Sequence, residues 1–189
     1  MNSLLVILSG PEPQRTVFEK LILKQLASPL PVRQAGPTPL LRERGALIVQ
    51  GITEKNERRK LSENVELVSH LTSEELQKEI LSSEIILSRP GYSTVMDLAV
   101  LGKKAIFIPT PGQTEQEYLA KYFSEKKIAY SVSQEKFDFQ TALKESEKYS
   151  GFTGSYSGND FKKAVDEFLA KTKALRLGQG DSRLTLSSK

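Results

Sequence analysis

The segment SRPGYSTVMDLAVLGKKAIFIPTPG, residues 88–112, predicts the end of a strand, a turn, a helix and a second strand. The turn is Arg89-Pro90-Gly91, and the helix is expected over residues 93–101, with Ser93 or Thr94 as its N-cap and Gly102 at its C-terminal stop. Backbone N–H groups at the start of a helix have no partner within it, and the helix dipole adds positive potential there. This order of elements therefore predicts an anion site that suits a phosphate.

Length and composition favour one domain with an appendage. Of the 189 residues, 38% are hydrophobic, which is ordinary for an α/β protein. The absence of cysteine excludes a disulfide scaffold, a cysteine nucleophile and thiolate metal ligands, and it fits a reducing compartment. The net charge of +4 comes from basic residues interleaved with acids, so no nucleic acid is expected as a partner. No apolar run reaches the ~18–20 residues of a membrane span.

Strands and helices are expected to alternate along most of the chain. Apolar runs predict strands at residues 3–8, 46–52, 65–68, 85–88, 105–109 and 128–132. Helical spacing of apolar residues predicts helices at residues 14–26, 73–81, 93–101, 115–127 and 137–148. Residues 53–62 are expected to be a charged connection. The pattern predicts an α/β fold with a doubly wound, Rossmann-like parallel sheet.

The predicted domain covers residues 1–149. Within it, the prolines of residues 28–45 indicate an irregular loop. The glycines and serines of SGFTGSYSG are typical of a linker, so residues 150–173 are expected to hold a linker and a C-terminal helix that packs on the domain. The polar residues 174–189 are expected to form a flexible tail.

Four turns are expected to meet at one edge of the sheet, because ligands in such folds bind beyond the carboxyl ends of the strands. Residues 88–97 are either a diphosphate cradle or an ordinary helix entry. Asp97 either accepts hydrogen bonds from a ribose diol or is a solvent-facing acid. The first turn, with Ser9, Gly10 and Arg15, is either a second wall of the crevice or a proline-stiffened connection.

Two further turns carry polar candidates. Gln113, Gln116 and Glu117 suit a polyhydroxyl ligand, although Thr114 and Glu117 also fit the capping box of an ordinary helix start. His70, the sole histidine, fits a structural role better than a catalytic one. With no second histidine and no cysteine, no metal site is expected. The sequence also lacks the glycine-rich dinucleotide fingerprint and the P-loop lysine motif.

The segment SRPGYSTVMDLAVLGKKAIFIPTPGQTEQ resembles the signature of the C-terminal, donor-binding domain of GT-B glycosyltransferases. The resemblance is to the glycosyltransferase family 28 type, which includes the bacterial N-acetylglucosaminyltransferases of peptidoglycan lipid-precursor synthesis, and it covers residues 4–143. The matching positions are Ser88, Arg89, Gly91, Thr94, Val95, Asp97, Gly102, Pro109 and Gln116. The family usually has serine at Pro90 and glutamate at Asp97.

The resemblance implies a role for each matched turn. Asp97 would hold the donor ribose, and the loop and helix start that contain Ser88, Arg89, Gly91, Ser93 and Thr94 would hold the diphosphate. Gln116 and Glu117 would contact the donor sugar, where relatives often have two amides. The backbone of His70 and Leu71 would bind the uracil edge, and Ser9-Gly10 would correspond to the family's glycine-rich first loop.

The resemblance also implies an activity. The expected protein is the donor half of an inverting hexosyltransferase that uses a UDP-sugar without a metal or other cofactor, at the cytoplasmic face of a membrane or free in the cytoplasm. In the family, the acceptor site and the base come from an N-terminal domain. The chain is therefore expected to be a truncated, inactive C-terminal half, or one subunit of a split enzyme. A sugar-nucleotide 2-epimerase half and a non-catalytic sugar-nucleotide-binding subunit remain alternatives.

Overall fold

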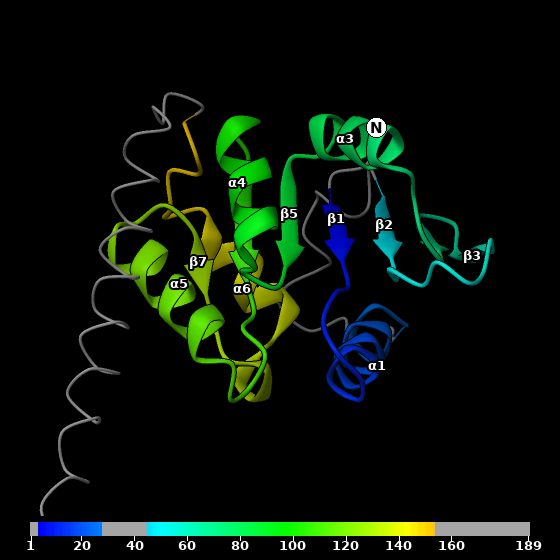
Figure 1. Cartoon of the computed structure of the whole chain (residues 1–189), viewed down its shortest axis with the longest axis horizontal. Helices are drawn as coiled ribbons and strands as arrows, with labels where there is room; N and C mark the ends of the chain where they lie inside the picture. The colour runs from blue at the N-terminus through cyan, green and yellow to red at the C-terminus, as the bar shows by residue number, and fades with distance from the viewer. Residues whose placement is uncertain (1–3, 28–44, 154–189) are drawn as a thin grey trace, which may run out of the picture. The chain divides into compact units, whose positions relative to one another are not determined.

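The computed structural model of the protein describes residues 4–27 and 45–153, which belong to the first of two units, Met1–Gly154. The strands are β1 (Leu4–Ile7), β2 (Ala46–Val49), β3 (Arg58–Ser62), β4 (Val65–Val68), β5 (Ile85–Ser88), β6 (Lys104–Phe107) and β7 (Tyr130–Ser131). The helices are α1 (Gln14–Ala27), α3 (Ser73–Ser82), α4 (Tyr92–Val100), α5 (Thr114–Glu125), the 3₁₀ turn η1 (Gln134–Lys136) and α6 (Phe139–Ser146) (Figure 1).

The strands form one sheet in the order β3-β4-β2-β1-β5-β6-β7. All neighbouring pairs are parallel except β3 and β4, so the parallel part has the strand order 3-2-1-4-5-6 of a Rossmann fold. Strand order reverses between β1 and β5, where Ile7 pairs with Ser88 at the carboxyl edge. The predicted α/β, doubly wound fold is confirmed, and its switch point lies at the start of the loop that precedes α4.

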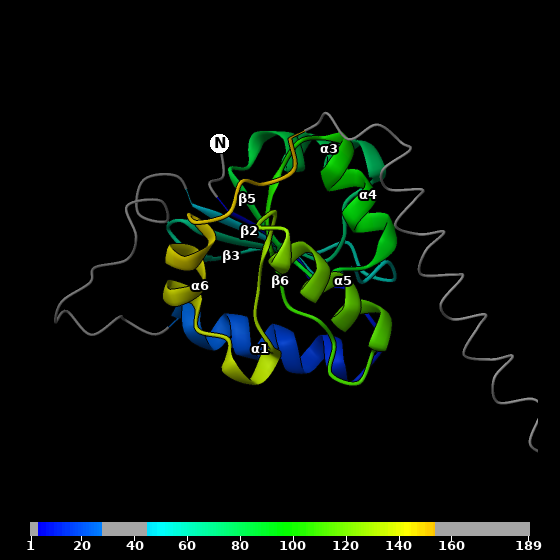
Figure 2. The ribbon, with the colours of Figure 1, turned by 90° about the vertical axis from the view of Figure 1, so that its left-hand side faces the viewer.

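Alternating strand residues face two different helical layers. Leu4, Val6, Ile85 and Leu87 share a core cluster with Phe18 of α1 and with residues of α6. Phe107 of β6 instead packs against Phe123 of α5. In Figure 2 the strands lie between α1 and the pair formed by α3 and α4. Both faces of the sheet are covered, which explains why its strands are continuous apolar runs.

The prediction that residues 53–62 are only a connection is wrong at its second half. Arg58–Ser62 forms β3, which runs antiparallel to β4 at the edge of the sheet, and all five of its residues are exposed. An exposed edge strand needs no apolar face, and its charges discourage pairing with another chain. The apolar pattern that marks the other strands is therefore missing here.

The predicted cap of the central helix is also wrong. Helix α4 begins one residue early, at Tyr92, with Gly91 as its N-cap and with no side-chain hydrogen bond to the cap. Its other end is as predicted, because Gly102 adopts a φ of 62° and the N–H of Lys103 bonds the carbonyl of Leu98 at 3.0 Å.

The prediction that a linker begins at residue 150 is wrong for residues 150–152, which are hydrogen-bonded to the domain. The N–H groups of Ser150, Gly151 and Phe152 bond the carbonyls of Lys127, Ile128 and Lys103 at 2.9–3.0 Å. Phe152 is 4% exposed and lies against the rings of Phe107 and Phe123. The predicted loop at residues 28–44, and the remaining linker, last helix and tail predicted at residues 154–189, lie outside the described residues.

We expect the substitution Phe152→Ala to lower the free energy of unfolding by about 3–5 kcal/mol, because it leaves a cavity between two aromatic rings. Chemical denaturation of the whole chain measures this. The control is Val100→Ala, at a position that is 78% exposed, which should change stability by less than about 0.5 kcal/mol. Equal effects of the two substitutions would show that Phe152 is not part of the core.

Candidate functional site

The loops that follow β1, β5 and β6 meet at the carboxyl edge of the sheet. Gly10, in the loop after β1, has a φ of 113°, which residues with a side chain rarely adopt. A Cβ atom on Gly10 would lie 3.8 Å from Thr110 Oγ1, which belongs to the loop after β6. The loops after β1 and β6 are therefore neighbours, as the sequence predicts. The loop after β5 lies with them, because β5 is the strand between β1 and β6.

The start of α4 presents its backbone without a side-chain cap. No atom lies within 4 Å of the Cβ position of Gly91, so the space in front of the helix end is open. The first turn contains Ser93, which is exposed, and Thr94, which is half-buried. The first N–H groups of a helix lack partners within it and face outward. This end of α4 can accept an anion from the side of the crevice.

The same edge gathers buried polar atoms that have no partner. Among residues 4–27 and 45–153, the buried side-chain atoms without a hydrogen bond are Gln14 Oε1, Ser88 Oγ, Arg89 Nε and Thr110 Oγ1. All four belong to the first residue of α1, the end of β5 or the loops that follow β5 and β6. Buried polar groups normally find partners, and exceptions call for a ligand, a water molecule or a functional role.

The side chain of Arg89, in the loop expected to hold the diphosphate, lies inside the fold. It is 1% exposed, and its Nη1 donates to the carbonyls of Ile108 at 2.9 Å and Pro109 at 3.0 Å. Its Nη2 donates to the Gln14 carbonyl at 3.4 Å and to Gln134 Oε1. Burial lowers the pKa of Arg89 to about 10, so the group stays positively charged at neutral pH.

Arg15 is held by acids of its own helix and loop. Its Nη1 bonds Glu19 Oε2 at 3.0 Å, and its Nη2 forms an ion pair with Glu12. Glu19 in turn accepts a hydrogen bond of 2.6 Å from the amide of Gln50, which directly follows β2. The predicted contact between Arg15 and a phosphate would have to compete with these two carboxylates.

The two polar side chains predicted to meet the donor sugar shape the loop after β6. Gln116 Oε1 accepts a hydrogen bond of 2.8 Å from the N–H of Thr110, and Glu117 Oε1 accepts one of 3.0 Å from the N–H of Gly112. The alternative capping box of Thr114 and Glu117 is wrong, because the N-cap of α5 is Gln113, with no side-chain cap. The amide nitrogen of Gln116 and the second carboxylate oxygen of Glu117 remain for a ligand.

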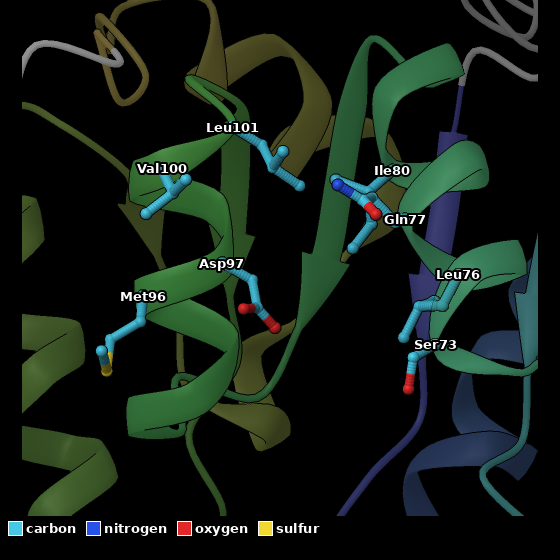
Figure 3. A pocket seen from close by; sticks show the side chains of 8 residues that line it. All are labelled: Ser73, Leu76, Gln77, Ile80, Met96, Asp97, Val100 and Leu101. Carbon is cyan, nitrogen blue, oxygen red and sulfur yellow. The ribbon is translucent and has the colours of Figure 1, made fainter.

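Asp97 lies on one wall of a groove between α3 and α4. The groove has a volume of about 480 Å³ and is lined by Ser73, Leu76, Gln77, Ile80, Met96, Asp97, Val100 and Leu101. Figure 3 shows the carboxylate of Asp97 pointing into the space between the helices, with Ser73 and Gln77 on the facing wall. A mostly apolar groove with a few polar side chains suits a nucleoside.

His70 and Leu71 form the turn between β4 and α3. The Nδ1 atom of His70 lies 2.8 Å from the carbonyl oxygen of Lys55, so this nitrogen carries the proton and donates it. Thr72 and Glu75 then form a reciprocal capping box that starts α3. The imidazole thus has a structural contact, as the sequence analysis favours, while the backbone of the turn stays beside the groove entrance at Ser73.

The described residues contain no group of three or more histidine, cysteine, aspartate and glutamate side chains that could hold a metal ion. The same residues include no helix of the length and apolar character that a membrane crossing requires.

The structure thus places several of the predicted site residues at the switch point of the sheet and others around it. Ser9, Gly10, Ser88, Gly91 and the start of α4 share the switch point, whereas Asp97 faces the groove. Sequence reasoning missed Gln14, Thr110, Gln134, Ser73 and Gln77. Gln14 and Thr110 could have been found from their places directly at strand-to-helix turns, but nothing in the sequence marks Gln134.

Comparison with known proteins assigns the family. The glycosyltransferase family 28 C-terminal domain matches residues 37–151, which is more than half of the chain. Two similar curated proteins are UDP-N-acetylglucosamine–N-acetylmuramyl-(pentapeptide) pyrophosphoryl-undecaprenol N-acetylglucosamine transferases. The protein from Histophilus somni is 40% identical over 30% of this chain, and the one from Rhodopseudomonas palustris is 36% identical over 32%. The matched part spans only 16% of the length of each.

Solved structures agree on the fold. The solution structure of ALG13 matches with a TM-score of 0.55 at 13% identity, over 86% of this chain and 94% of that chain. The spinosyn forosaminyltransferase SpnP matches with a TM-score of 0.54 at 13% identity, over 90% of this chain and 44% of that one. The Rossmann-like sheet is thus shared with GT-B glycosyltransferases, and the chain belongs to the family of glycosyltransferase family 28 C-terminal domains.

Proposed function

We propose that this chain binds the UDP-sugar donor of an inverting hexosyltransferase, as the C-terminal half of a GT-B enzyme. The observation that carries the proposal is the combination of an uncapped α4 start, unpartnered buried hydroxyls beside it, and Asp97 in the adjoining groove. These features can take the diphosphate and the ribose of one nucleotide. Membership of the family and the names of the curated relatives support a nucleotide-sugar.

The diphosphate is assigned to the start of α4. Its backbone N–H groups and the helix dipole stabilise negative charge. Because Gly91 has no side chain, the ligand can approach the backbone closely. As the sugar is transferred, negative charge develops on the departing UDP. Preorganised N–H groups stabilise such charge at no further reorganisation, which lowers the barrier. In this proposal the chain handles the charge of the leaving group without a metal ion.

The nucleoside is assigned to the groove between α3 and α4. Asp97 stands on the second turn of α4, beyond the proposed diphosphate contacts, and its carboxylate can accept hydrogen bonds from both ribose hydroxyls. The apolar side chains of Leu76 and Leu101 give the base a surface that excludes water. The turn at His70 and Leu71 offers backbone groups to the edge of a uracil.

The donor sugar is assigned to the loop after β6. Because Gln116 Oε1 is occupied by the Thr110 N–H, its amide nitrogen is the group left to donate to a sugar hydroxyl. Glu117 keeps one oxygen that can accept from another hydroxyl. This pair suits a hexose with free hydroxyls, and N-acetylglucosamine is the sugar named for the curated relatives.

Transfer requires groups that we assign to another domain or subunit. The acceptor oxygen attacks the anomeric carbon, the bond from that carbon to the diphosphate oxygen breaks, and a base takes the acceptor proton. We propose that the base and the acceptor site lie in an N-terminal domain, so this chain alone binds UDP but does not transfer sugar. The second possibility is that a separate subunit supplies the acceptor site. The ALG13 structure supports it, because the match covers 94% of that chain and the fold therefore makes up nearly all of it.

The ribose contact can be tested at Asp97. We expect Asp97→Ala to weaken the binding of UDP by about 1–3 kcal/mol, because the substitution removes the acceptor of the ribose hydroxyls. Calorimetric titration with UDP measures the change. The control is Glu125→Ala, which removes an exposed acid at the far end of α5 and should leave the affinity within twofold.

Each outcome of this titration decides a different assignment. UDP binding that is insensitive to Asp97 would remove the ribose contact and leave the fold assignment standing. No UDP binding by the wild-type chain would overturn the proposed donor function for this chain.

A substitution at Glu117 separates binding of the sugar from binding of the nucleotide. We expect Glu117→Ala to weaken the binding of UDP-N-acetylglucosamine by about 1 kcal/mol or more and to leave UDP affinity unchanged, because its free oxygen is assigned to a sugar hydroxyl. The same titration with both ligands measures the difference. Equal losses for UDP and for the UDP-sugar would mean that Glu117 acts on the loop and not on the sugar.

A further inference from the structure

Arg89 is a buried cation without a matching acid. Its side chain is among the largest fully buried ones, and no carboxylate of residues 4–27 and 45–153 forms an ion pair with it. The groups that receive its hydrogen bonds are three carbonyls and the amide oxygen of Gln134. Its guanidinium carbon also lies 4.2 Å from the centre of the Phe18 ring. These neighbours orient the guanidinium, but none of them carries a negative charge.

The position of this charge is set by the loops of the candidate site. Its guanidinium donates hydrogen bonds to the backbone carbonyls of Ile108 and Pro109, directly after β6, and to that of Gln14, the first residue of α1. Arg89 directly follows Ser88 at the switch point and directly precedes the turn into α4. The cation therefore lies beneath the crevice to which the diphosphate is assigned.

The unpartnered polar atoms gather at the same place. Gln14 Oε1 belongs to a residue that accepts a bond from Arg89, Ser88 Oγ to its neighbour, and Thr110 Oγ1 to the residue after Pro109. Two hydroxyls and a backbone helix start are the donors that a phosphate group would use. A buried positive charge beneath them would add a long-range attraction that a low-dielectric interior screens weakly.

We propose that Arg89 is a positioning residue whose buried, uncompensated charge is matched by the diphosphate of the donor when it binds. The inference rests on the proposed donor site and adds to it the source of its positive potential. Arg89 makes no direct contact in this account. It fixes the loops after β5 and β6 against α1 through hydrogen bonds, and it selects a charged diphosphate through its field.

The alternative explanation is that Arg89 only holds the loops together, and the two explanations differ in the ligand affinity that they predict for a variant with a carboxylate beside Arg89. If Arg89 only holds the loops together, a nearby negative charge strengthens the clamp and leaves ligand affinity unchanged. If the charge of Arg89 also attracts the diphosphate, the same carboxylate neutralises it in advance. The protein then gains stability while it loses affinity for diphosphate.

Gln134 is the place to make this change. Its Oε1 already accepts a hydrogen bond from Arg89, it is buried, and Gln134→Glu alters charge with almost no change of shape. We expect Gln134→Glu to raise the melting temperature of the chain. We expect the same variant to bind UDP and inorganic diphosphate about tenfold more weakly, with the affinity for uridine unchanged.

Two matched variants separate charge from structure. Gln134→Leu removes the acceptor without adding charge, so it should lower the melting temperature and change the ratio of UDP to uridine affinity by less than threefold. Gln140→Glu adds the same charge at a distance from Arg89. Gln140 follows Phe139, whose backbone N–H donates a hydrogen bond to Gln25. Gln25 lies eleven residues along α1 from Gln14, about 16 Å in a helix. This variant should leave UDP affinity within twofold.

The titrations of UDP, uridine and inorganic diphosphate, with thermal melts of the four proteins, decide the matter. Wild-type binding of UDP with equal affinity in Gln134→Glu would overturn the inference and leave the proposed donor site intact. An equal loss for UDP and uridine in Gln134→Glu would also overturn it, because the effect would then be structural. Failure of the wild-type chain to bind UDP would overturn the proposed function and, with it, this inference.

Discussion

A single guanidinium, that of Arg89, connects the parts of the fold that form the candidate site. Its hydrogen bonds run to the loop after β6, to the first residue of α1 and to η1, and its flat face lies over the Phe18 ring. A parallel sheet ends at its carboxyl edge in carbonyls that no further strand can satisfy. A five-donor side chain placed there pairs several of them at once and fixes the relative positions of segments that are far apart in sequence.

The rest of the site is built by the same device on a smaller scale. Gln116 and Glu117, on the first turn of α5, reach back to N–H groups of the loop that precedes them. Thr72 and Glu75 do so reciprocally at the start of α3. The start of α4 is the exception, since its cap is a glycine with no side chain to offer. Helices α4 and α5 both begin without a side-chain hydrogen bond to the cap, but only α4 begins at the switch point and with a glycine as its cap.

The sequence predicts the strands well where burial on both faces requires a continuous run of apolar residues. Leu4–Ile7 and Ile85–Ser88 are strands that helices cover on both faces, and their continuous apolar runs predict them. Arg58–Ser62 was missed because an exposed edge strand has no such run. Phe152 was assigned to a linker because the glycines and serines around it hid the one side chain that enters the core.

The sequence predicts the position of the candidate site in the fold, but not the side-chain contacts within it. The order strand, turn, helix predicts a candidate anion site at Gly91 without any knowledge of side-chain directions. Arg89 is different, because an arginine before Pro-Gly has the composition of a surface turn, and only the tertiary partners at Gln14 and Gln134 draw it inside. Its burial depends on residues 75 and 45 positions away in sequence, which local patterns cannot register.

The hydrogen bonds of Gln116 and Glu117 also constrain which ligand atoms the loop after β6 could recognise. The Thr110 N–H is buried and fixes Gln116 Oε1, so the amide of Gln116 cannot rotate to present its oxygen without leaving that N–H unpaired. Glu117 is under no such constraint, because its partner Gly112 is exposed and water can replace the contact. Of the two residues, Gln116 therefore offers a ligand a fixed donor, whereas Glu117 offers an acceptor that can adjust. A change of sugar specificity would be accommodated more readily at Glu117 than at Gln116.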